Sequence, residues 1–323
     1  MADISTEQLI SAGRFHEHGR LFYYSEQYED KKMSPIDLHT HSNKSDGTYT
    51  PEELVRYAQA KGLSAVALTD HDTVDGIAEA IAASERMKAE GIAPVPEVIP
   101  GVELSTDHNG KDVHIVGLFP DWKNAEFSAR LHAFADARIY RNLRMCKLLM
   151  DAGYDITYED LEAAFPDTVI TRAHFAQYLL RRGVISSIEE AFSKLIGDDC
   201  PYFVSREKIS PHFAVEFLLQ FGGVPILAHP LQYKMTDADL QALVSSLSEL
   251  GLTGIEVYYP GYKPSDTAGL CRLVDQYGLF YSGGSDFHGA NKKNLDLGTG
   301  YGHLYVPDSI LAPLREKAMS LKK

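Results

Sequence analysis

From Ile36 onward the chain alternates short apolar runs with longer segments of helical pattern. The runs that we interpret as strands are PIDLHTH, LSAVALTDHD, VPILAHP, TGIEVYYP and LFYSGGSDFH, and stretches such as TPEELVRYAQAKG and DADLQALVSSLSELG separate them as helices. This alternation is typical of parallel β/α units. In such folds the carboxyl ends of the strands form one face, on which functional sites are built. The sequence therefore predicts an α/β domain with one functional face.

Two segments depart from the alternation. The peptides PEVIPGVELST and KDVHIVGLF flank DHNG, a turn signal that predicts a hairpin. Residues 122–205 have helical patterns only, and we interpret them as an all-helical insertion. We therefore divide the chain into an N-terminal extension of unknown role (1–35), a metal-binding β/α domain (36–121 and 206–323) and the insertion.

The first predicted helix carries start and stop signals. In TPEELVRYAQAKG, Thr50 can cap the helix, Pro51 suits its first position, and Glu53 completes a capping box. Gly62 is expected to end the helix.

The composition is that of a globular protein whose charge disfavours general binding of polyanions. Of 323 residues, 44% are hydrophobic and 24% are charged, and no run approaches the roughly 20 apolar residues of a membrane span. The net charge of −14 repels polyanions at long range, although some of the 45 acids can be metal ligands. The N-terminal MADISTEQLI is not typical of a signal peptide, and the three cysteines lie far apart. We therefore expect a cytoplasmic protein without disulfides or a membrane partner.

Residue types that bind metals stand at the ends of the predicted strands. In chain order they are His39, His41, Asp46, His71, Glu103, His114, His229, Asp286 and His288. Imidazole and carboxylate groups bind divalent ions such as Mn²⁺ and Zn²⁺. Because residues i and i+2 of a strand point the same way, His39 with His41, and Asp286 with His288, can face one cavity. Nine such residues exceed the needs of one ion and suit two or three, with Glu103 as a bridge.

This order of motifs resembles the polymerase-and-histidinol-phosphatase (PHP) family, a branch of the amidohydrolase-like metal hydrolases. The peptides DLHTHSNKSDG, TDHD, PGVE, AHP and SDFHG stand at the family's places, and TRAHFAQYL is similar to the R-x-H-F-A motif of the members with a helical insertion. The resemblance covers residues 36 to about 305. It implies a distorted (β/α)₇ barrel and phosphoesterase activity on nucleotides, nucleotide ends or small phosphorylated sugars.

The resemblance also implies three metal positions. Their ligands would be His39, His41, Glu103 and Asp286 for the first, Glu103, His114 and His229 for the second, and Asp46, His71 and His288 for the third. We expect two or three divalent ions, with Mn²⁺ preferred and Fe²⁺ or Zn²⁺ as alternatives.

Five residues are predicted to bind substrate, namely Arg172, His174, Arg138, Arg141 and Lys44. Thr171 is a predicted helix N-cap, so Arg172 and His174 fall in the first turn, where anions are favoured. An arginine there adds a planar pair of donors for phosphate oxygens. Arg138 and Arg141 are three residues apart on a predicted helix and share a face. Lys44 lies inside the first metal loop.

The leading interpretation is a metal-dependent phosphoesterase that acts on a small phosphorylated metabolite, either a monoester or a cyclic diester. A metal-activated water would attack phosphorus, and Asp46, Asp72 or a histidine near the third metal would protonate the leaving group. The alternative is a 5′-3′ exonuclease, but a polymer needs a basic track with aromatic stacking, and we find one short basic stripe. A non-catalytic module would not need so many ligands, and the paired arginines favour phosphate over an amide. The sequence leaves the oligomeric state open.

Overall fold

The computed structural model describes residues 35–322 except 167, 198 and 205–208, with the side chains of 135–137 also excluded. Of the first 34 residues it describes β1 (His16–Glu17) and β2 (Arg20–Leu21), which pair antiparallel. Apart from these four residues and residue 35, the extension predicted over residues 1–35 lies outside the described residues, as does the predicted end of the insertion at residue 205.

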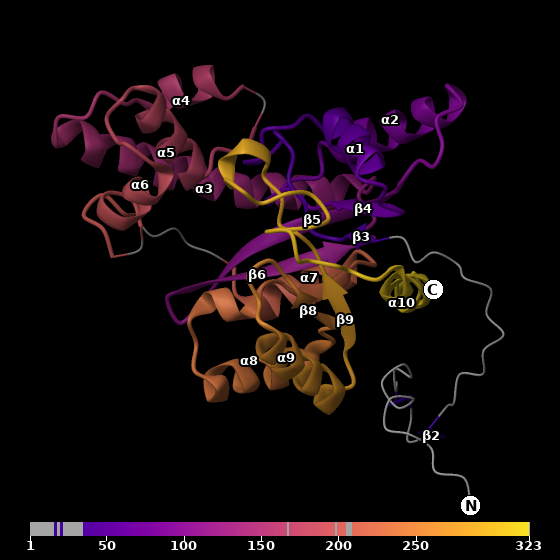
Figure 1. Cartoon of the computed structure of the whole chain (residues 1–323). Helices are drawn as coiled ribbons and strands as arrows, with labels where there is room; N and C mark the ends of the chain where they lie inside the picture. Colours follow the sequence, from indigo (N-terminus) through magenta and orange to yellow (C-terminus); the bar gives the residue numbers. More distant parts are fainter. Residues whose placement is uncertain are drawn as a thin grey trace, which may run out of the picture. The chain divides into compact units, whose positions relative to one another are not determined.

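Seven strands form one sheet in chain order (Figure 1). They are β3 (Ile36–Asp37), β4 (Ala65–Leu68), β5 (Glu97–His108), β6 (Lys111–Leu118), β7 (Val224–Leu227), β8 (Gly254–Tyr258) and β9 (Phe280–Gly283). The first strand meets the last, because Leu38 N–H donates to Gly283 O (3.1 Å) and Thr40 forms a parallel bridge with Phe287. The sheet therefore curls into a distorted seven-stranded barrel, and the predicted fold class is confirmed.

All neighbouring strands of the sheet are parallel except where β6 is involved. The pairs β3–β4, β4–β5, β7–β8 and β8–β9 are parallel. β5 and β6 form the hairpin predicted from DHNG, with left-handed Asn109 and Gly110 (φ 55° and 79°) in its turn. β6 is antiparallel to both neighbours, so the parallel alternation predicted for the other strands does not extend to its pairing with β7. The chain consequently leaves β6 at the edge of the sheet opposite the functional face.

Six helices of the described chain pack around the barrel. They are α1 (Pro51–Ala60), α2 (Ile77–Ala89), α7 (Pro211–Gln220), α8 (Asp237–Leu250), α9 (Pro264–Tyr277) and α10 (Leu311–Leu321), with short 3₁₀ turns η2 (Pro230–Tyr233), η3 (Gly289–Asn291) and η4 (Asp308–Ile310). The predicted Thr50 cap, with its capping box to Glu53, is present at α1. No helix in the described part of the chain has the length and apolar character needed to cross a membrane.

The barrel strands alternate between two apolar layers. Val66 and Leu68 of β4 face the layer under the surrounding helices, whereas Ala65 and Ala67 face an inner layer. Leu314 of α10 belongs to this inner layer. These packed layers fix the strand ends from which the functional side chains project.

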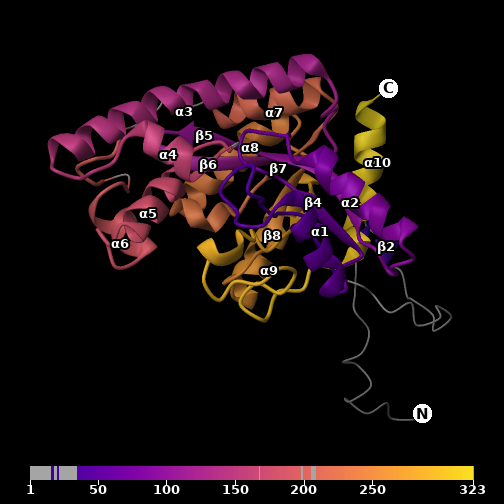
Figure 2. The same cartoon turned by 90° about the horizontal axis from the view of Figure 1, so that it is seen from above.

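Helices α3 (Ala125–Asp151), α4 (Tyr158–Ala164), α5 (Arg172–Arg181) and α6 (Ile188–Lys194) form the insertion (Figures 1 and 2). The 27 residues of α3 extend about 40 Å, which carries the chain from the end of β6 back to the functional face. The first turns of α3 pack on α7, where the rings of Phe127 and Phe217 stack at 5.3 Å. The distal part has its own apolar core, including Leu149, Phe175 and Leu179.

Candidate active site

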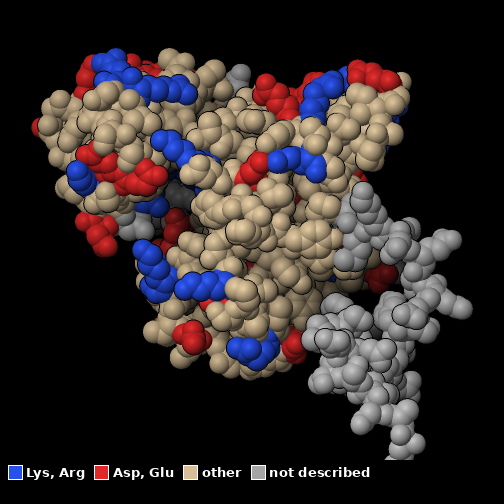
Figure 3. Space-filling model, viewed as in Figure 1, with Lys and Arg blue, Asp and Glu red and all other residues tan. Residues whose placement is uncertain are grey.

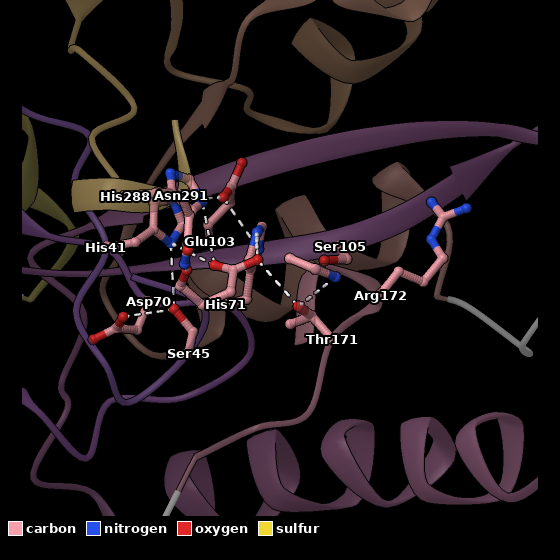
Figure 4. Close-up of polar contacts among 12 residues, drawn as sticks. His41, Ser45, Asp70, His71, Glu103, Ser105, Thr171, Arg172, His288 and Asn291 are labelled. Atoms are coloured by element: carbon pink, nitrogen blue, oxygen red, sulfur yellow. Dashed lines mark hydrogen bonds and ion pairs between the residues drawn. The ribbon is translucent and has the colours of Figure 1, made fainter. Parts of the chain in front are cut away.

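Glu103 of β5 lies at the centre of a cluster formed by the predicted metal ligands (Figure 4). Its Oε2 is 3.2 Å from His39 Nε2, 3.1 Å from His41 Nε2 and 3.1 Å from His71 Nδ1. Although they lie close to Glu103, these three buried nitrogens make no hydrogen bond to any described residue. Buried imidazole nitrogens that converge on a carboxylate in this way fit a divalent cation.

The other oxygen of Glu103 faces histidines from two further strands. Oε1 is 2.8 Å from His114 Nδ1 and 3.0 Å from His229 Nε2. The sequence predicted His114 at the carboxyl end of a parallel strand. It lies instead within the antiparallel strand β6, where it pairs with Ser105 of β5. It reaches the cluster because β6 is antiparallel, which sets its first half beside the last half of β5.

Asp46, His71 and His288 meet at a third point of the cluster. Asp46 Oδ1 is 3.2 Å from His288 Nε2, and its Oδ2 is 3.8 Å from His71 Nε2. The loop that carries Asp46 is anchored by buried Asp70, which accepts a hydrogen bond from the Ser45 hydroxyl (2.6 Å; Figure 4). Asp70 therefore supports this loop and is not part of any predicted ligand set.

Asp286 belongs to the cluster although it lies beyond the end of its strand. It follows the end of β9 and has a left-handed backbone, with φ 53°, so the predicted i, i+2 alignment of Asp286 with His288 along a strand is wrong. The two side chains nevertheless approach, with His288 Nδ1 at 3.3 Å and His41 Nε2 at 3.5 Å from Asp286 Oδ1. Asp286 Oδ2 accepts hydrogen bonds from Tyr259 (2.7 Å) and Lys292.

The donor atoms of the nine residues fall into groups compact enough to hold cations. Four such groups have all their ligand atoms within 4.8 Å of one another, and they are His41, Asp46, His71 and His288; His39, Glu103 and His229; His39, His41 and Asp286; and His71, Glu103 and His114. The residues therefore fit divalent metal ions, and Glu103 belongs to two of the groups.

The electrostatics of the cluster also indicate a site for cations. Burial raises the pKa of a carboxyl, but the charges of His39, His114 and His71 hold the pKa of Glu103 well below its usual range. Burial lowers the pKa of an imidazole, yet nearby carboxylates raise the pKa of His41 to about 9 and that of His114 to about 10. Buried anions thus require compensating positive charge, which bound cations can supply.

A cavity of about 210 Å³ lies between this cluster and the insertion. Figure 3 shows a hollow between the two parts, with charged side chains near its rim. The lining residues are Asp46, His71, Ser105, Asp112, His114, Arg138, Arg141, Thr171, Arg172, Ala173, Phe192, Phe203 and Val204. One wall therefore presents predicted metal ligands, and the other presents the three arginines predicted to bind substrate.

Arg172 is fixed at the start of α5 by several contacts. Thr171 caps the helix as predicted, accepting a hydrogen bond from Ala173 N–H (3.2 Å). The Arg172 guanidinium is 3.3 Å from Asp112 Oδ2 and lies over the ring of Phe203, 5.2 Å from its centre. Figure 4 shows the side chain to one side of the histidine cluster.

Arg138 and Arg141 reach the same cavity from α3, and both are buried. Arg138 Nε donates to Asp72 Oδ2 (2.9 Å), and its Nη2 donates to Ser105 Oγ (2.8 Å). Arg141 Nε donates to Asn142 Oδ1 (2.8 Å). Asp72, which the sequence analysis named as a possible catalytic acid, is therefore bound to an arginine and is not among the residues that line the cavity.

The remaining two predicted substrate residues do not line this cavity. His174 is buried, and its Nδ1 accepts a hydrogen bond from Thr171 N–H (2.9 Å), which closes the capping box of α5. The backbone carbonyl of Lys44 accepts from Val169 N–H (3.2 Å), a contact between the metal loop and the insertion. Substrate binding by His174 and Lys44 stays a prediction, and the geometry gives both residues a structural contact.

Sequence reasoning did not identify several residues of the site. Asp112 contacts both His114 Nε2 (3.2 Å) and Arg172, and its spacing of two from His114 was a usable signal because β6 alternates. Glu256 is buried behind His39. Neither Glu256 nor the ring of Phe203 over Arg172 had a local signal, since both contacts join distant segments.

Comparison with known proteins gives three relevant matches. The PHP domain profile matches residues 37–199. The chain is 37% identical over 266 residues to a 5′-3′ exoribonuclease of Haemophilus influenzae, covering 81% of this chain and 94% of that protein. It is 33% identical over 267 residues to a 3′,5′-nucleoside bisphosphate phosphatase of Chromobacterium violaceum, covering 82% of this chain and 91% of that protein.

Among solved structures, an amidohydrolase from Chromobacterium violaceum with bound sulfate and no metal superposes with a TM-score of 0.77 and 31% identity, covering 88% of this chain and 97% of that one. A barrel with histidine and carboxylate side chains clustered at one face is typical of amidohydrolase-like hydrolases that use divalent metals. The chain belongs to the PHP family. It is an enzyme that hydrolyses phosphoric esters.

Proposed function

We propose that the enzyme hydrolyses a small phosphorylated metabolite, a nucleotide that carries a second phosphate, with two or three divalent ions, most favourably Mn²⁺. The cavity carries the proposal, because the predicted metal ligands Asp46, His71 and His114 share it with three arginines. A phosphate bound beside Asp46, His71 and His114 would leave a second phosphate of the same substrate facing the guanidinium groups.

The metal positions are proposed as the three sets that the family resemblance implies, with Glu103 shared by two. Bound ions would supply charge neutralisation of the phosphoryl oxygens and a lowered pKa for an attacking water. The chain contributes the orientation of the substrate. Arg172 is pre-ordered by Phe203 and Asp112, so its guanidinium loses less freedom when it binds phosphate.

The geometry separates the two aspartates that were candidates for the general acid. Burial raises the pKa of Asp46, but His71 and His288 more than offset this and hold it well below its usual range. We therefore assign Asp46 as an ionised ligand. Asp72 accepts hydrogen bonds from Arg138 and from Ser105 N–H (3.1 Å), and we assign it to holding Arg138 in the cavity wall. A catalytic role for either aspartate stays a prediction.

The relatives support this substrate class and one alternative. The Chromobacterium violaceum relative is named for 3′,5′-nucleoside bisphosphates, and the similar solved structure holds sulfate, an anion shaped like phosphate. The Haemophilus influenzae relative is a 5′-3′ exoribonuclease. Trimming of RNA 5′ ends therefore remains the second candidate, since it requires the same ester chemistry with a longer leaving group.

Salt dependence distinguishes the two candidates. We expect kcat/KM for a nucleoside 3′,5′-bisphosphate to exceed that per end of an RNA oligomer. Raising the salt concentration from 50 to 200 mM should lower it less than about tenfold, whereas six or more phosphate contacts would cost roughly a thousandfold. Both substrates are assayed side by side by released phosphate or nucleotide. Faster turnover of the oligomer with a steep salt dependence would establish the exonuclease instead.

The phosphate-binding role of Arg172 gives a second expectation. Arg172→Ala should lower kcat/KM by one to two decades, because a hydrogen bond from a charged group contributes roughly 1.5–3 kcal/mol. Metal content should be unchanged. Arg182→Ala is the matched control, since Arg182 caps the other end of α5 and pairs with Asp155 at the surface. Loss of metal in the Arg172 variant would show that the arginine supports the cluster.

A further inference from the structure

A buried carboxylate behind the metal-ligand cluster has no role in the proposed chemistry. Glu256 lies on β8 and is 2% exposed. Its two oxygens contact different predicted ligands, with Oε1 3.2 Å from His39 Nδ1 and Oε2 accepting the backbone N–H of His229 at 2.7 Å. In the predicted ligand sets these two histidines belong to different metal positions, the first and the second.

We propose that Glu256 is a positioning residue that holds His39 and His229 in ligand geometry and thereby couples two metal positions, without binding metal itself. The inference rests on the ligand sets of the proposed function. Glu256 belongs to none of the compact groups of ligand atoms found among the described residues. Both of its oxygens already have nitrogen partners, and Glu256 is not among the residues that line the cavity.

Glu256 sets which nitrogen of His39 can bind a cation. His39 Nε2 faces the cluster, 3.2 Å from Glu103 Oε2 and 3.8 Å from Asp286 Oδ1. A histidine that offers its Nε2 lone pair to a metal must carry its proton on Nδ1, where Glu256 accepts it. Carboxylates behind ligand histidines orient the ring and raise its basicity, and their loss typically lowers metal affinity 10–100-fold.

The second contact of Glu256 fixes an uncommon backbone. His229 has φ 27° and ψ 54°, a conformation that residues other than glycine rarely adopt. Its backbone N–H points to Glu256, while its side-chain Nε2 points to Glu103 Oε1 (3.0 Å). The hydrogen bond to Glu256 therefore helps to hold the turn that presents this imidazole to the cluster.

Glu256→Gln tests the proposal because it keeps the shape of the side chain and removes one hydrogen-bond acceptor. Two N–H donors, from His39 and His229, need two oxygens, and Glu256→Gln supplies only one. Either His229 loses its acceptor, or the amide NH₂ faces His39 Nδ1 and forces the proton to Nε2. Glu256→Asp keeps a carboxylate but is one methylene shorter, so it should satisfy only one donor well.

The experiment measures Mn²⁺ binding to metal-free full-length protein by calorimetry, together with the melting temperature of each metal-free form. We expect Glu256→Gln to bind at least one Mn²⁺ about 10–100-fold more weakly than wild type, with a similar melting temperature without metal. Glu256→Asp should be intermediate. Glu249→Gln, an exposed change on α8, is the matched control and should bind as wild type does.

Three results would overturn the inference. Wild-type affinity in Glu256→Gln, within about twofold, would show that the residue does not position ligands. Weak binding in both variants accompanied by equal losses of metal-free melting temperature would make Glu256 a general structural residue. A wild-type protein that binds no Mn²⁺ would overturn the ligand sets of the proposed function as well, so the two failures are distinguishable.

Discussion

Replacement of Glu103 by glutamine is expected to lower kcat/KM by roughly two to four decades while the protein stays folded. Glu103 is 1% exposed, and its two oxygens face five imidazole nitrogens at distances between 2.8 and 3.2 Å. Removing this charge would leave the surrounding imidazoles without the carboxylate that holds them together with a cation, and each 1.4 kcal/mol lost from transition-state binding lowers the rate about tenfold. Because Glu103 is the proposed bridge, one substitution should weaken two metal positions.

The same strand provides a control for this expectation. Glu97 begins β5 and forms a surface ion pair with Arg315 (2.6 Å). Glu103 follows Glu97 by six positions, which places them roughly 20 Å apart along the strand. Glu97→Gln should leave kcat/KM within about twofold, since exposed pairs contribute little. Near-normal activity and metal content in Glu103→Gln would show that Glu103 does not bridge metals.

Removal of divalent metal is expected to have the largest effect of all, a fall of phosphate release to the background of the assay. Asp46, His71 and His114 form the wall of the cavity opposite its three arginines, and carboxylate and imidazole groups of this kind bind divalent cations. Without ions the phosphoryl group would face Asp46 across a low-dielectric cavity, an unfavourable encounter of like charges. Chelation followed by dialysis, with restoration by Mn²⁺ and no restoration by Na⁺, checks this expectation.

Much of the fold could be predicted because its signals are local. The Thr50 capping box, the DHNG turn and the Thr171 cap each depend on residues within a few positions of one another. The alternation of strand and helix patterns gave the α/β barrel, since short parallel strands need helical crossovers. The antiparallel course of β6 was not predictable beyond its hairpin, because its pairing with β7 spans the whole insertion.

The candidate site was predictable as a set of residues but not as an arrangement. The structure brings the nine predicted ligands together, and their role as ligands stays a prediction. The sequence could not show that Asp72 pairs with Arg138, 66 residues away, or that Glu256 lies behind His39, 217 residues away. Such contacts depend on how the barrel closes and where the insertion folds back, which no local pattern encodes.

This PHP-family protein is a phosphoesterase, and we propose that its activity depends on divalent metal held by the Glu103 cluster. The most direct measurement combines elemental analysis with turnover, in which metal-free protein is titrated with Mn²⁺ while phosphate release from a nucleoside 3′,5′-bisphosphate is followed. We expect activity to rise with bound metal and to level off at two to three ions per chain. Full activity at a metal content near zero, or two to three bound ions with no release of phosphate from any ester, would contradict the claim.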